Sequence, residues 1–61
     1  MGAAEVETRR TLREVARELS AEAARLRLDS ARLEARGFRS LAGDVRAIAV
    51  RLEQVVRWCR A

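Results

Sequence analysis

The side chains able to do chemistry in this chain are arginines, carboxylates and one thiol. The 61 residues include thirteen arginines, no lysine, no histidine, nine aspartates or glutamates, and a single cysteine, Cys59. Histidine is the commonest general base and metal ligand, and one cysteine can form neither an internal disulfide nor a multi-cysteine metal site. We therefore predict a protein that is not an enzyme and needs no metal or cofactor.

Arginine side chains are suited to binding carboxylates. A guanidinium group can hold a carboxylate through two parallel hydrogen bonds, including across an interface. Arg32 and Arg46 are candidates for such a partner contact. The alternative is a solvated helix face with local pairs, such as Asp29 with Arg32 or Glu53 with Arg57. Pairs of that kind contribute only about 0.3 to 0.5 kcal/mol each.

Positive charge is concentrated in the second half of the chain. Residues 1–35 hold seven arginines and seven acids, whereas residues 36–61 hold six arginines and two acids, a net charge of +4. Three of these arginines share one heptad position: Arg39, Arg46 and Arg60. Such a ridge could neutralise phosphates, but the chain has only two aromatics, Phe38 and Trp58, and no base-reading motif. An RNA- or DNA-binding hairpin dimer is therefore an alternative, and nucleic acid is not the expected partner.

Helical periodicity organises the first half of the chain. Leucines recur every seventh residue, at Leu12, Leu19, Leu26 and Leu33. Small residues lie between them, namely Val15 or Ala16, then Ala23 and Ser30, so a neighbouring helix could approach closely. A second apolar stripe runs along an adjacent face: Ala21, Ala24, Leu28, Ala31 and Ala35. The helix predicted over residues 5–35 thus has two faces to bury.

The second half contains another seam with alternating spacings of three and four. Its members are Phe38, Leu41, Val45, Ile48, Leu52, Val55 and Cys59. The phase jumps by five residues between Leu33 and Phe38, whereas a continuous coiled coil would continue after three or four. Gly37 lies at the jump and can adopt the positive φ that ends a helix. We predict a turn at residues 36–39, a second helix at 40–60 and hence an antiparallel helical hairpin.

One long continuous coiled-coil helix is the alternative fold. It is suggested by an unbroken heptad stripe: Ala21, Ala24, Leu28, Ala31, Ala35, Phe38, Ala42, Val45, Ala49, Leu52, Val56 and Cys59. Gly37 and Gly43 would then lie inside a helix, at a cost of about 1 kcal/mol each relative to alanine. The leucine seam, which that stripe ignores, favours the hairpin.

A lone hairpin would leave one apolar stripe uncovered. Two helices joined by a short loop bury one face of each, and a chain this short buries only about 60% of its unfolded surface. We therefore predict a homo-oligomer, with a dimer that forms a four-helix bundle favoured. In its generic form this would be a small structural or regulatory bundle. Cys59 would be a small buried hydrophobe, and Trp58 would cap the open end or meet a partner.

Membrane insertion and secretion find no support in the sequence. No apolar run approaches the about 18 residues that a spanning helix needs, and the N-terminus lacks the layout of a secretory signal. We predict a cytoplasmic protein without a membrane span.

Residues 36–49, RGFRSLAGDVRAIA, resemble the start of the descending helix in the cytoplasmic tip of bacterial chemoreceptors, the methyl-accepting chemotaxis proteins. The positions that match by identity are Arg36, Gly37, Phe38, Ala42, Val45, Arg46 and Ala49, and those that match by type are Leu41, Asp44 and Ile48. Residues 15–32 resemble the ascending run, although Arg25 and Arg27 replace an asparagine and an alanine. The family's five-residue turn is reduced to Leu33-Glu34-Ala35.

The resemblance implies a non-catalytic protein-protein interaction module in signal transduction. Chemoreceptors are dimers whose paired hairpins form a four-helix bundle, and their tips contact a kinase and its coupling adaptor. The implied partners are thus a chemotaxis kinase, an adaptor or receptor-like proteins. Phe38, Arg32 and Arg46 would be contact residues, and Glu34 would replace the acidic residue of the tip.

Overall fold

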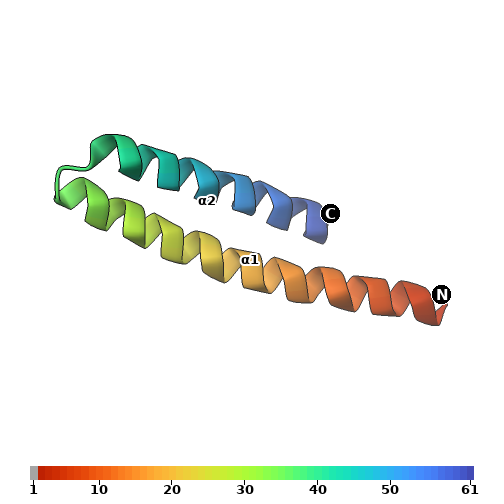
Figure 1. Cartoon of the computed structure of the whole chain (residues 1–61). Helices are drawn as coiled ribbons and strands as arrows, with labels where there is room; N and C mark the ends of the chain where they lie inside the picture. The colour runs from red at the N-terminus through yellow and green to blue at the C-terminus, as the bar shows by residue number, and fades with distance from the viewer. Residues whose placement is uncertain (1) are drawn as a thin grey trace.

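The computed structural model of the protein describes residues 2–61 and shows two helices that lie side by side (Figure 1). Helix α1 spans Ala3–Ala35 and helix α2 spans Arg39–Arg60, with no strand in the described part of the chain. The helices are antiparallel and form a rod of 52 × 13 × 11 Å. This confirms the predicted helical hairpin. One continuous helix is excluded, since at 1.5 Å per residue it would be far longer, about 80 Å or more.

The turn is a glycine-based helix stop. The Phe38 amide donates to the Leu33 carbonyl (2.9 Å) and the Gly37 amide to the Glu34 carbonyl (3.0 Å). These two bonds form a Schellman motif, which requires a left-handed residue at the position of Gly37. Gly37 has a φ of 90°, as its place at the phase jump suggested. The turn occupies residues 36–38, so α2 begins at Arg39, one position before the predicted start.

In α1 the small residues of the leucine seam are the buried ones: Ala16, Ala23 and Ser30. Leu19, Leu26 and Leu33 lie half-buried between and beyond them, while Leu12 is exposed. This helix therefore turns the expected face, leucines alternating with small residues, towards α2.

In α2 the buried face differs from the predicted seam. The buried residues are Ala42, Ala49 and Val56, with Val45, Leu52, Val55 and Cys59 half-buried. Phe38, Leu41 and Ile48, which we expected in the seam between the helices, are 57%, 50% and 51% exposed. Helix α2 is thus rotated about its axis so that alanines, not leucine and isoleucine, face α1. The physical reason is a close approach of the two backbones, which larger side chains would prevent.

One hydrogen bond reports this close approach directly. The buried Ser30 hydroxyl donates to the backbone carbonyl of Ala42 at 2.7 Å. Counting one heptad at a time from this contact places Ala23 level with Ala49 and Ala16 level with Val56. Within residues 2–61, no side chain larger than that of Ser30 is fully buried. The core of a single hairpin is therefore thin.

Candidate interaction surface

Ion pairs between the helices lie along one side of the seam. Arg27 donates to both carboxylate oxygens of Glu53, from Nε at 2.6 Å and from an Nη at 2.8 Å. One heptad nearer the turn, Arg46 donates to Glu34 at 3.0 Å. Both pairs are exposed to solvent, and together they define the register between α1 and α2 on this side.

The Arg27–Glu53 pair changes the acidity of both groups. The hydrogen bonds from Arg27 lower the pKa of the Glu53 carboxyl below its ordinary 4.5. In return, the hydrogen bonds to Glu53 raise the pKa of Arg27. Each group therefore holds the other in its charged form.

The arginines that the sequence identified are largely engaged within the hairpin. Arg46 pairs with Glu34 across the two helices. Arg32 forms the local pair with Asp29, at 3.6 Å. Glu53 pairs with Arg27, not with Arg57. The arginine ridge, on which the alternative of nucleic-acid binding depended, is thus interrupted by carboxylates at two levels.

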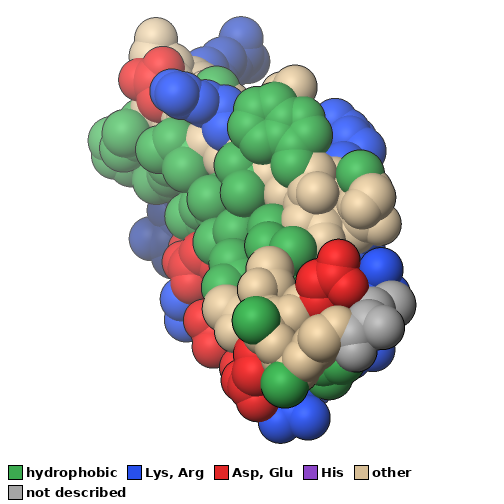
Figure 2. Space-filling model, turned by 90° about the vertical axis from the view of Figure 1, so that its right-hand side faces the viewer, with side chains coloured by type: hydrophobic (Ala, Val, Ile, Leu, Met, Phe, Trp, Pro, Cys, Tyr) green, Lys and Arg blue, Asp and Glu red, His purple; other side chains and the backbone are tan. Residues whose placement is uncertain are grey.

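On the other side of the seam α2 presents a row of large aliphatic residues. This row, called here the α2 row, consists of Leu41, Ile48 and Val55 at heptad spacing. Leu41 and Ile48 are half exposed, and Val55 is partly so. The two aromatic residues, Phe38 and Trp58, lie near its ends and are 57% and 67% exposed. Seen from the open end of the hairpin, hydrophobic side chains form a continuous band with charged groups at its sides (Figure 2).

Two opposite charges border the α2 row. Asp44 lies three residues after Leu41 and four before Ile48, and Arg51 has the same spacing to Ile48 and Val55. Residues at these spacings are neighbours on a helix surface, so both charges border the row. Both are exposed, and neither takes part in an ion pair among the described residues. The sequence alone does not identify this pair, because its relevance depends on which face of α2 is turned outward.

The second stripe of α1 is also exposed. It contains one large residue, Leu28, at 53% exposure, and otherwise only alanines. Because hydrophobic stabilisation scales with the apolar area removed from water, this stripe offers less than the α2 row.

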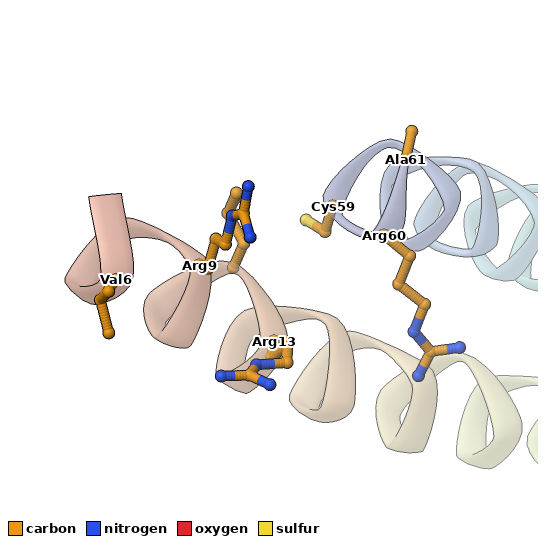
Figure 3. Close-up of a pocket in the computed structure, with 7 residues that line it drawn as sticks. Val6, Arg9, Arg13, Cys59, Arg60 and Ala61 are labelled. Carbon is orange, nitrogen blue, oxygen red and sulfur yellow. The ribbon is translucent and has the colours of Figure 1, made fainter. Parts of the chain in front are cut away.

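A shallow pocket lies at the open end of the hairpin, where α1 extends beyond α2 (Figure 3). The close-up shows Arg60 reaching from α2 towards α1 and Arg9 rising from α1. The complete lining is Val6, Arg9, Leu12, Arg13, Cys59, Arg60 and Ala61.

Three further findings bear on function. Neither α1 nor α2 is both long and apolar enough to cross a membrane. Cysteine and carboxylate side chains do not gather into a possible metal site within residues 2–61. No protein-family model, curated protein or solved structure matches the chain.

Proposed function

We propose that this hairpin is a non-catalytic protein-interaction module that binds a partner helix through the α2 row. The observation that supports this proposal most is the exposure of Leu41 and Ile48, one heptad apart, beside a seam built from alanines. Large aliphatic residues at heptad spacing are the means by which one helix packs into another. Burial of this row by a partner would be favourable, because each Å² of apolar surface removed from water contributes about 25 cal/mol of stabilisation.

The thin core supports the same proposal. Four alanines and one valine make up the buried hydrophobic residues of the described chain. Small chains with so little buried apolar area gain stability mainly from a disulfide, a metal or association. With one cysteine in the sequence, association through an exposed row is the available route.

Chemotaxis signalling is a second candidate function. The run that resembles the chemoreceptor tip forms the closed end of the hairpin, with Phe38 exposed there. However, Leu33, Glu34 and Ala35, which replace the family's turn, are helical here. Binding of the purified chain to a chemotaxis kinase and adaptor, compared with Phe38→Ala, would test this candidate. A chain that binds neither protein would eliminate it.

The test of the main proposal is site-directed photo-crosslinking in cells that produce the chain. A photoreactive amino acid replaces Ile48 on the α2 row or Ala47, an exposed residue on another face of α2. Circular dichroism of both purified variants establishes that they are helical. We expect a defined protein adduct from position 48 and little or none from position 47. Equal yields at the two positions, or no adduct at 48, would refute the role of the row.

A further inference from the structure

We propose that the partner on the α2 row is a second copy of this chain, and that the two α2 helices pack antiparallel about a two-fold axis at Ile48. This inference rests on the proposed function, because it names the partner of the same surface. The evidence for it is the order of apolar and charged residues along α2. When two α2 helices run antiparallel, apolar residues face apolar residues and opposite charges meet, whereas parallel helices would bring like charges together.

The apolar residues match in the antiparallel arrangement. Leu41 lies seven residues before Ile48 and Val55 seven after it. Reversal about Ile48 therefore places Leu41 level with the partner's Val55 and Ile48 level with the partner's Ile48. A two-fold interface uses the same patch on both copies, so these contacts occur in symmetric pairs. Every large residue of the row then faces another aliphatic side chain.

The bordering charges distinguish the two directions of packing. Asp44 lies four residues before Ile48 and Arg51 three after it, so the antiparallel arrangement brings Asp44 nearly level with the partner's Arg51. Two opposite-charge pairs result. A parallel arrangement in register instead opposes Asp44 to Asp44 and Arg51 to Arg51. Since neither residue has an ion-pair partner within the described hairpin, both charges are free for this role.

The aromatic residues lie at the two ends of the proposed interface. Phe38 lies ten residues before Ile48 and Trp58 ten residues after it, and both are more than half exposed. Antiparallel packing brings Phe38 to the level of the partner's Trp58, but with 3.6 residues per turn the two rings lie on opposite sides of the row and do not face each other.

Placing the α2 row on α1 of the second copy, with both turns at the same end, buries less apolar area. Counted from the Ser30–Ala42 contact, Leu41 lies level with Ala31 and Ile48 with Ala24, two alanines of the second stripe of α1. A second hairpin aligned turn to turn would therefore lay the row over alanines. Because hydrophobic stabilisation scales with the apolar area removed from water, packing α2 on α2, which opposes larger side chains, is favoured.

Charge reversal tests the arrangement. Sedimentation equilibrium of the full chain at about 150 mM salt, which screens the net charge over distances beyond about 8 Å, measures the dimer dissociation constant. The variants are Asp44→Arg, Arg51→Asp, the double variant, and an equimolar mixture of the two single variants. Arg57→Asp, on another face of α2, is the control for the change in net charge. Circular dichroism checks that each variant is helical.

We expect the wild-type chain to dimerise and each single variant to dissociate about tenfold more readily, since exposed charge pairs contribute modestly. The double variant and the mixture should recover the wild-type constant to within about threefold, and Arg57→Asp should retain it. The fluorescence of Trp58 should shift to shorter wavelength on dimerisation. A double variant as weak as the singles, or single variants as tight as wild type, would overturn the antiparallel arrangement.

The two proposals can fail separately. The wild-type chain could stay monomeric while position 48 crosslinks to a different protein. That result would overturn the proposal that the partner is a second copy, and it would support the proposal of an interaction module. Absence of both dimer and crosslink overturns both proposals.

Discussion

The hydroxyl of Ser30 in α1 donates a 2.7 Å hydrogen bond to the backbone carbonyl of Ala42 in α2. A serine side chain is short, so this bond requires the two helix backbones to lie close together. The same approach explains why alanines occupy the levels of Ala23 and Ala49 further from the turn. Enlarging any of these side chains should separate the helices.

Ser30→Leu should destabilise the hairpin more than Ser30→Ala. The alanine variant loses one hydrogen bond, which should lower the free energy of unfolding by about 0.5 to 1.5 kcal/mol. The Ala42 carbonyl keeps its backbone hydrogen bond within α2. The leucine variant adds overpacking, which costs about 1 to 3 kcal/mol more. Urea denaturation followed by circular dichroism measures both. Equal losses would mean that the helices do not depend on close approach at this level.

Ala49→Leu should lower the free energy of unfolding by about 1 to 3 kcal/mol, because Ala49 is completely buried in the seam. Ala47→Leu is the matched control, since Ala47 is exposed on the same helix and should change stability by less than about 0.5 kcal/mol. Thermal denaturation distinguishes the two. If Ala49→Leu were as stable as Ala47→Leu, the alanine seam would be wrong.

Gly37→Ala and Gly43→Ala should have opposite effects. Gly37 has a φ of 90°, so alanine there should cost about 1 to 2 kcal/mol. Gly43 lies inside α2, and an added Cβ would meet nothing within 4 Å. Alanine at that position should stabilise the protein by about 0.5 to 1 kcal/mol. Chemical denaturation of both variants tests the pair, and a stabilised Gly37→Ala would contradict the observed turn.

Acidification should weaken the hairpin partly through Glu53. Because Arg27 lowers the pKa of Glu53 in the folded chain, folding favours its ionised form. This contribution is complete above the ordinary pKa of 4.5 and is lost as the pH falls through the lowered value. Glu53→Gln should therefore lose less stability than wild type between neutral pH and pH below about 4.

Arg27→Gln provides the matched comparison for that experiment. It removes the partner, so it should reduce the acid sensitivity in the same way, and the double variant should add no further change. Urea midpoints recorded across the pH range give this double-mutant cycle. Additive effects of the two substitutions would show that Arg27 and Glu53 do not act as a pair.

The fold was predictable because the signals for it are local. Leucines every seventh residue, a phase jump between Leu33 and Phe38 and a glycine within the jump indicate two helices and a turn. Each signal depends on residues a few positions apart. The Schellman bonds and the φ of Gly37 are the direct consequence of that local pattern.

The inward face of α2 was not predictable in the same way. Two interleaved stripes share Val45 and Leu52, and they differ by one position: one continues through Leu41 and Ile48, the other through Ala42 and Ala49. Hydrophobicity favours the stripe with larger side chains, whereas close backbone approach favours alanine. The sequence alone does not show which of these two effects determines the face that α2 turns towards α1.

Periodicity and the conformational freedom of Gly37 thus predict an all-helical chain, the position of its turn and the face that α1 buries. The rotation of α2, the ion pairs Arg27–Glu53 and Arg46–Glu34, and the outward position of Leu41 and Ile48 follow instead from the packing of the two helices. These depend on how near one helix axis lies to the other, and that distance is set by residues far apart in the chain.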